Sequence, residues 1–221
     1  MGNIRTKTAT TPTTKGIKAQ TSKVSIVMAA RICFASKGLF DATMDDIQAA
    51  AGVSRGKMYY HFKNKDEIVQ TVIEENLGAM ALRIEAIVAQ SREQHLTFEN
   101  ILVELTSFAE QITFGPGKGM AFHVWSYAMI NEPVRAMLGV FFRRIRALLE
   151  QEIDTLQQLG KLPQAVQPKE AATALFGLII PGFTVQRSFL ENEAIDAKTY
   201  IKTIFSVFGL QSTAAGGMTP D

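Results

Sequence analysis

The sequence predicts an all-α protein, and three observations support this fold class. From about residue 22 onward, apolar residues recur with the 3.6-residue period of an α-helix almost to the end of the chain. No segment shows the alternation of apolar and polar residues that is typical of a half-buried β-strand. Glycine and proline interrupt the helical pattern at intervals that match helix lengths in globular proteins. We therefore expect a small N-terminal group of three helices followed by a larger helical domain.

The first four helices have recognisable start or stop signals. The first helix stops at Gly38, and the sequence TMDD, which begins at Thr43, resembles a capping box with Asp in place of Glu or Gln. Ser54 is a suitable N-cap for a short third helix, and the sequence NKDE, which begins at Asn64, is a capping signal for a long fourth helix. The expected ranges are 22–37, 43–51, 54–62 and 64–90.

Five further helices are expected in the second half of the chain, at about 97–114, 117–130, 132–159, 168–190 and 195–209. The breaks between them are supplied by Gly115-Pro116-Gly117, Pro133, Gly160 and Pro168. The helix at 132–159 has two adjacent apolar stripes, and a helix that is apolar on more than one side is usually buried between others. It should therefore lie at the centre of the larger domain.

Charge is distributed unevenly along the chain. Residues 1–65 contain 11 Lys and Arg against 3 Asp and Glu, whereas residues 66–221 contain 12 against 18. Such an asymmetry favours an N-terminal part that faces a polyanion, although a basic tail on an ordinary globular protein would also produce it. The expected division is a disordered basic arm at 1–21, an N-terminal domain at 22–68, a helical domain at 69–210 and a disordered tail at 211–221.

Several classes of protein are disfavoured by the sequence. The N-terminus lacks the apolar segment of a secretory signal. The most apolar run, 171–185, is about fifteen residues long and is interrupted by Pro181, so it is too short to span a bilayer. The single cysteine, Cys33, excludes an intrachain disulfide and a cysteine-rich zinc site. We expect a cytoplasmic protein with no membrane segment, no metal and no cofactor.

Residues 43–67, TMDDIQAAAGVSRGKMYYHFKNKDE, have the pattern of a helix-turn-helix. The two short helices meet at a Gly-Val-Ser corner and share a small core formed by Ile47, Ala50, Val53, Met58 and Phe62. Helical spacing leaves a basic and aromatic set on or beside the outer face of the second helix, namely Arg55, Lys57, Tyr59 and His61. Such a helix is suited to the DNA major groove. Gly56 costs about 1 kcal/mol in a helix, which is reasonable if a side chain there would hold the helix away from the groove.

Two polar residues lie at helix N-termini in this segment. A cation at the first position of a helix, as at Lys65, is disfavoured by some tenths of a kcal/mol. A phosphate placed there would be held by Lys65 and by free backbone N–H groups together. Thr43 could act in the same way with its hydroxyl. A lone surface lysine is usually only solvated and Tyr60 could belong to the core, so the hypothesis depends on the concentration of these residues in one short segment.

Residues 29–77 resemble the DNA-binding domain of the TetR (tetracycline-repressor) family of bacterial transcription regulators. The matching positions are Phe34, Gly38, Thr43, Ile47, Ala50, Gly52-Val53-Ser54, Gly56, Tyr59-Tyr60-His61-Phe62 and Lys65. Gln48 and Met58 are small departures from the family pattern. The resemblance implies that DNA is contacted by Thr43, Ser54, Arg55, Gly56, Lys57, Tyr59, Tyr60, His61 and Lys65. Base contacts are implied for Arg55, base or backbone contacts for Lys57 and Tyr59, and phosphate contacts for Thr43, Tyr60, His61 and Lys65.

The layout of the family implies that the second half forms a homodimer and binds a small hydrophobic or amphipathic effector. Candidate lining residues of an effector pocket are Phe108, Phe114, Phe122, His123, Trp125, Tyr127, Met129, Phe142, Phe176 and Phe183. Candidate residues of the dimer interface are Ala174, Leu175, Leu178, Ile179, Gly182, Ile201, Ile204, Phe205 and Phe208. Helical spacing alone would also place most of these side chains in an ordinary core.

The favoured hypothesis is a ligand-responsive repressor that binds a palindromic double-stranded DNA operator as a homodimer and is released by its effector. Two alternatives remain open: a DNA-binding regulator controlled by abundance or by a protein partner, and a helical enzyme. The enzyme is disfavoured because His61, His95 and His123 are scattered and Cys33 lies in a core pattern. The loop at 115–119 also lacks the full pattern of a phosphate-binding loop.

Overall fold

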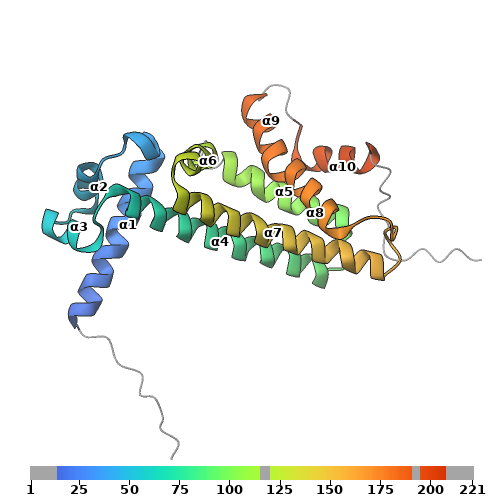
Figure 1. The fold of residues 1–221 in the computed structure, drawn as a ribbon, viewed down its shortest axis with the longest axis horizontal. Helices are drawn as coiled ribbons and strands as arrows, with labels where there is room; N and C mark the ends of the chain where they lie inside the picture. Colours follow the sequence, from blue (N-terminus) through green and yellow to red (C-terminus); the bar gives the residue numbers. More distant parts are fainter. Residues whose placement is uncertain (1–13, 115–119, 191–194, 208–221) are drawn as a thin grey trace, which may run out of the picture. The chain divides into compact units, whose positions relative to one another are not determined.

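The computed structural model describes residues 14–114, 120–190 and 195–207. These residues form helices and their connections, and no strand occurs among them. The chain divides into two compact units, Met1–Val72 and Ile73–Asp221. The division falls within a long helix, four residues after the boundary expected at 68. Figure 1 labels the helices and colours them along the chain, from blue at the N-terminus to red at the C-terminus.

The N-terminal unit contains α1 (Thr14–Asp41), α2 (Met44–Ala51), α3 (Arg55–His61) and the first turns of α4 (Lys65–Glu93). Gly38 has φ 82° and ψ 168°, so regular helix geometry ends where the sequence indicated. At its other end α1 begins at Thr14, although the sequence predicted a start near residue 22. The last residues of the expected arm are therefore helical, while residues 1–13 lie outside the described residues.

The helix-turn-helix is formed by local capping interactions. The Thr43 hydroxyl accepts a hydrogen bond from the backbone N–H of Asp46 at 3.1 Å, and the Asp46 carboxylate accepts one from the backbone N–H of Thr43 at 2.9 Å. These two bonds confirm the predicted capping box. Gly52 closes α2 in the left-handed region with φ 62°. The Ser54 hydroxyl caps α3 by accepting a bond from the N–H of Lys57 at 3.3 Å.

The core of the N-terminal unit comes from all four of its helices. Ile26, Ala30, Ile47, Met58 and Ile68 are fully buried. Phe34, Leu39, Phe62 and Val69 are at most 3% exposed. Cys33 is also buried, and burial raises the pKa of its thiol above the usual value. The expectation of a core cysteine is therefore confirmed, and α3 packs against α1.

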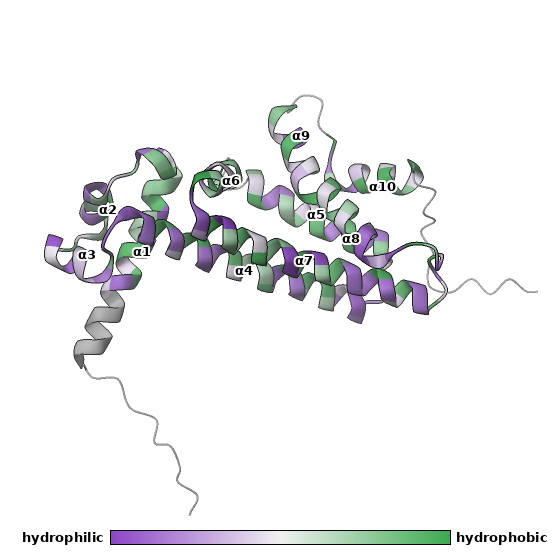
Figure 2. Ribbon diagram, in the orientation of Figure 1, coloured by the Kyte–Doolittle hydropathy of each residue, from purple (hydrophilic) through white to green (hydrophobic). Residues whose placement is uncertain are grey.

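The C-terminal unit contains the rest of α4 and the following elements: α5 (Phe98–Phe114), α6 (Met120–Ile130), α7 (Glu132–Gln158), α8 (Pro168–Gly177), η1 (Leu178–Phe183), α9 (Thr184–Phe189) and α10 (Ala197–Val207). Its helices carry alternating hydrophilic and hydrophobic residues along their length, as Figure 2 shows. The long helix α7 buries Leu138, Phe141, Ile145, Leu149 and Ile153 on one face. Two ion pairs, Arg144 with Glu85 and Arg92 with Glu152, join α7 to α4.

The segment predicted as one helix at 168–190 is divided by a π-helical turn, η1. Pro181 lies inside this turn and has no N–H to donate to the carbonyl of Gly177, so a regular α-helical bond is impossible there. The wider π turn accommodates the proline. The Tyr200 hydroxyl of α10 donates a hydrogen bond to the carbonyl oxygen of Leu178 at 3.1 Å, which secures the irregular turn.

Candidate DNA-contacting surface and ligand cavity

The outer face of α3 and its N-cap form a basic and aromatic surface, here called the recognition surface. It consists of Ser54, Arg55, Gly56, Lys57, Tyr59 and Tyr60, all of which are exposed. Tyr60 is 77% exposed, so it does not belong to the core. The inward side chains Met58 and Phe62 are buried, as the helical spacing predicted. The exposed residues of the recognition surface and the buried Met58 and Phe62 lie on opposite sides because only one side of α3 packs against the rest of the unit.

Two details of the recognition surface bear on its chemistry. The Arg55 guanidinium lies 5.7 Å from the centroid of the Tyr59 ring, which orients the cation across the face of α3. A Cβ added to Gly56 would meet no atom within 4 Å. The fold therefore gives no reason for the absence of a side chain at Gly56, although glycine weakens a helix. An approaching partner remains a sufficient reason.

Thr43 is more completely engaged than the sequence indicated. Its hydroxyl donates to the Asp46 carboxylate at 2.8 Å, in addition to accepting the capping bond. Asp46 also accepts a hydrogen bond from the Lys37 ammonium at 2.6 Å. The Lys37 bond, followed by those from Thr43, lowers the pKa of Asp46 to about 2. The hydroxyl proton of Thr43 is thus used within the cap, and a phosphate here would be met by Lys37 and free N–H groups of the first turn.

Lys65 has an intramolecular role that the sequence did not indicate. Its ammonium donates a hydrogen bond to the carbonyl oxygen of Phe40 at 2.7 Å. This bond ties the start of α4 to the end of α1 and offers a structural reason for a cation at an otherwise unfavourable position. The ammonium group has two further N–H donors, so the expected phosphate contact remains compatible with the structure.

The ring of His61 is less accessible than the expected phosphate contact requires. Its Nε2 atom is buried and has no hydrogen-bond partner among the described residues. The ring packs edge-on against Tyr60, with centroids 5.0 Å apart. Burial, and after it the charges of Lys23 and Lys57, lowers the pKa of the imidazole below its usual value. In this conformation a neutral His61 does not present Nε2 to a phosphate.

Lys23 is a cation of this region that the sequence reading did not select. Its ammonium lies 5.7 Å from the centroid of the Phe62 ring, and its charge acts on His61. Lys23 belongs to α1, 32 residues before the start of α3 at Arg55, so its place beside the recognition surface depends on helix packing. The basic composition of the first 65 residues was the only signal for it.

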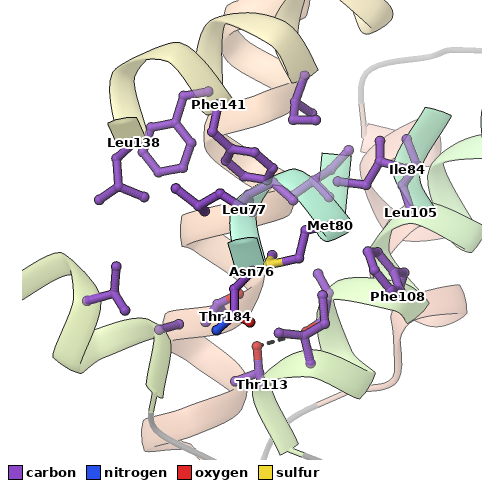
Figure 3. Close-up of a pocket in the computed structure, with 18 of the residues that line it drawn as sticks. Asn76, Leu77, Met80, Ile84, Leu105, Phe108, Thr113, Leu138, Phe141 and Thr184 are labelled. Carbon is purple, nitrogen blue, oxygen red and sulfur yellow. Dashed lines mark hydrogen bonds between the residues drawn. The ribbon is translucent and has the colours of Figure 1, made fainter. Parts of the chain in front are cut away.

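The C-terminal unit contains an apolar cavity of about 460 Å³. Figure 3 shows 18 of its lining side chains, which come from α4, α5, α7 and neighbouring elements. Aromatic rings of Phe108, Trp125, Phe141, Phe142 and Phe176 contribute to its walls. None of the described lining residues carries a charge. The cavity lies entirely within this unit.

Four of the ten residues predicted for an effector pocket line this cavity: Phe108, Trp125, Phe142 and Phe176. The other six are not among its lining residues. Phe183 and Tyr127 are buried, and Met129 and His123 are exposed. Phe122 packs against Trp125 and Phe189, and Phe114 lies under the Arg187 guanidinium.

The sequence reading missed the contribution of α4 to the cavity. Ile73, Asn76, Leu77, Met80 and Ile84 of this helix are lining residues. Their apolar spacing was visible, but it is equally typical of a helix that packs on an ordinary core.

The expected dimer interface requires a correction. Ile179, Ile201, Ile204 and Phe205 are buried in the core of their own chain, so they are not available to a second subunit. Leu175 and Leu178 are partly buried against this core. A Cβ at Gly182 would lie 3.2 Å from the Gly177 carbonyl oxygen and 3.4 Å from the Tyr200 hydroxyl, so this glycine serves internal packing. Ala174 is exposed, and Phe208 lies outside the described residues.

Two family models match this chain. The model described as "Bacterial regulatory proteins, tetR family" matches residues 26–72, which include the whole recognition surface. The model described as "BetI-type transcriptional repressor, C-terminal" matches residues 119–205, from α6 into α10. The chain belongs to the TetR family of bacterial regulatory proteins.

Relatives and solved structures agree with this assignment. The TetR-family chain is 40% identical over 57 residues to the HTH-type transcriptional regulator TtgR of Pseudomonas putida, and this match covers 26% of the chain and 27% of TtgR. The chain therefore matches only about a quarter of that relative's length. It is 25% identical over 163 residues to UidR of Escherichia coli K12, which covers 73% of the chain and 79% of UidR. The structure of Salmonella enterica GusR has the same fold, with a TM-score of 0.65, 23% identity and coverage of 85% and 94%.

Membership of the TetR family establishes the general class of activity. The protein is a DNA-binding transcriptional regulator with a helix-turn-helix, not an enzyme. Within the described ranges, no cluster of His, Cys, Asp and Glu side chains is arranged to hold a metal ion. No helix described for this regulator is both long and apolar enough to span a bilayer.

Proposed function

We propose that this regulator is a homodimeric repressor that binds a palindromic operator and releases it when a small effector occupies the cavity of the C-terminal unit. The observation that carries the proposal is the cavity itself, whose volume of about 460 Å³ lies in the range of small-molecule sites. A regulator controlled only by abundance or by a protein partner would gain nothing from such a cavity. Apolar volume that stays unfilled reduces stability.

DNA binding is assigned to the recognition surface. Arg55 and Lys57 supply positive charge there, and this surface contains no acidic residue. Contacts with phosphates would supply most of the affinity, and Arg55 could read guanine through its O6 and N7 atoms. Because α3 is only seven residues long, one copy reads few base pairs. Two copies about 34–36 Å apart would read a palindrome, which is the reason to expect a dimer.

The dimer contact is assigned to the exposed face of α8 and α9. Ala174, Gly177, Val185 and Phe189 follow one another at intervals of three, eight and four residues, and all are exposed. Phe189 is 73% exposed and Val185 is 41% exposed, so this face presents large apolar side chains to water. The small residues permit close approach of a second helix. The same face of a second subunit would cover this stripe in a symmetric contact.

The path between effector and DNA is assigned to α4. This helix begins three residues after α3 ends, and its later turns line the cavity through Asn76, Leu77 and Met80. An effector that displaces these side chains would move a helix whose start is joined to α3. A coupling free energy of ~1–3 kcal/mol between the two sites is enough for a graded switch.

The test is a fluorescence-anisotropy titration with an operator selected from random duplex DNA and from the DNA that flanks the gene. Arg55→Ala should cost about 1–3 kcal/mol in operator affinity and relax the base preference. Arg83→Ala, which removes an exposed arginine from the C-terminal unit, is the matched control. A dimer with no affinity for DNA of any sequence would refute the DNA-binding proposal. A panel of apolar and cationic molecules that never releases the operator would favour a regulator without an effector.

A further inference from the structure

The lining of the cavity restricts the charge of any molecule that could occupy it. Its described walls consist of aliphatic, aromatic and methionine side chains together with four uncharged polar ones, Asn76, Gln111, Thr113 and Thr184. A ligand charge would lose its hydration on entry and would find no opposite charge on these walls. The transfer of an unpaired charge into such an environment is strongly unfavourable.

Four charged side chains on the lining helices are already paired with one another. Glu110 of α5 accepts a hydrogen bond from the Arg187 guanidinium at 2.9 Å. Glu85 of α4 accepts one from the Arg144 guanidinium at 2.6 Å. A charged ligand that recruited any of these groups would have to break an existing ion pair. The cavity therefore favours neutral molecules.

The polar side chains are not evenly distributed around the cavity. Figure 3 shows Asn76, Thr113 and Thr184 at one end, away from Leu138 and Phe141. The hydroxyl of Thr113 donates to the carbonyl oxygen of Ala109 at 2.8 Å, so its proton is already used. Thr184 lines the cavity from α9, and its side chain is only 3% exposed. A hydroxyl in the wall of a cavity can both donate a hydrogen bond to a ligand and accept one from it.

We propose that the effector is an uncharged, mainly apolar molecule with one hydroxyl or carbonyl group, and that Thr184 hydrogen-bonds this group and determines specificity. The aromatic walls suit a body of two or three fused or linked rings. This inference rests on the proposed function only in calling the bound molecule an effector. Binding to the cavity can be measured without DNA.

The first experiment tests charge. The full-length protein is titrated with N-phenyl-1-naphthylamine, which is neutral, and with 8-anilino-1-naphthalenesulfonate, which has the same rings and a sulfonate. Both dyes fluoresce in apolar sites. The neutral dye should bind at least about tenfold more tightly, because the sulfonate would be buried without a partner. Ala121→Phe, which fills the cavity from α6, should abolish the neutral dye's signal. The proposal would be overturned if both dyes bound with equal affinity and Ala121→Phe abolished the binding of both. It would also be overturned if neither dye bound.

The second experiment tests Thr184 through displacement of the neutral dye by 2-naphthol and by naphthalene. Thr184→Val keeps the shape of the side chain but removes its hydroxyl. It should lower the affinity for 2-naphthol about 3- to 10-fold and leave the affinity for naphthalene unchanged. Thr184→Ser keeps the hydroxyl and should restore the affinity for 2-naphthol. Thr106→Val is the matched control, because Thr106 is buried on α5 outside the cavity lining. If Thr184→Val lowered the affinity for both ligands equally, or did not lower the affinity for 2-naphthol, Thr184 would not hydrogen-bond the polar group of the ligand.

A third measurement separates this inference from the proposed function. The same ligands are added to the protein bound to its operator, and release of the DNA is followed by anisotropy. If neutral probes fill the cavity but never release DNA, the proposed effector response is wrong and the assignment of cavity chemistry stands. If charged probes fill the cavity as tightly as neutral ones, the inference is wrong whether or not the DNA is released.

Discussion

Gly56 lies on the recognition surface with open space where a side chain would be. We predict that Gly56→Ala increases the free energy of unfolding by up to about 1 kcal/mol, since alanine loses less backbone entropy in a helix. If the glycine is required by close approach to DNA, the same variant should bind its operator more weakly. Gly78→Ala, also in open space but on α4, is the control and should gain stability without losing DNA affinity. Unchanged operator affinity of Gly56→Ala would contradict this explanation.

Asp46 should make stability depend on pH in the acid range. Its pKa is lowered from 3.8 to about 2 in the folded protein, first by the Lys37 ammonium and then by Thr43. Because the folded value lies below the unfolded one, the stabilisation is complete above pH 3.8 and is lost as the pH falls through about 2. Urea unfolding of the parent and of Asp46→Asn should therefore differ at pH 7 and converge near pH 2. Asp45→Asn, which keeps the Thr43 and Lys37 bonds, should not reproduce this pattern.

At the scale of elements, η1 depends on a contact from a helix about twenty residues later. We predict that Tyr200→Phe lowers the free energy of unfolding by about 1 kcal/mol, because the Leu178 carbonyl loses the hydroxyl bond while burial continues. The ring would stay against Phe183, whose centroid lies 5.2 Å away. Urea denaturation at one fixed protein concentration is the measurement. Tyr59→Phe, at an exposed position, is the control; a variant Tyr200→Phe as stable as the parent would show that the bond contributes nothing.

At the scale of the whole molecule, the exposed stripe of α8 and α9 decides whether two recognition helices can act together. Phe189→Lys should convert the dimer to a folded monomer, because a charge would be buried in the apolar contact. Sedimentation velocity reports the oligomeric state, and operator affinity should fall with it. Leu159→Lys, which alters an exposed leucine after α7, should leave the dimer intact. A dimer that survives Phe189→Lys would place the interface on another face.

Features that depend on residues close together in the chain could be predicted from the sequence. Features that depend on contacts between distant segments could not. The capping box at Thr43, the Ser54 cap, the Gly52 corner and the outward position of Arg55 follow from helical spacing and local hydrogen bonds. The bond between Lys65 and Phe40 joins residues 25 positions apart, so no local pattern indicated it. For the same reason, helical spacing could not separate the aromatic residues that line the cavity from those buried elsewhere.

The sequence by itself determined the all-α class, the order of most helices and the side of α3 that faces outward, because periodicity and capping act over a few residues. It also indicated the family through Gly52, Tyr60 and the other matching positions. Only the tertiary structure decided that α4 lines the cavity, that Ile201 and Phe205 belong to the core, and that Thr184 lies at the polar end of the cavity. An apolar position on a helix can face a core, a cavity or a second subunit, and the packing of distant helices selects among them.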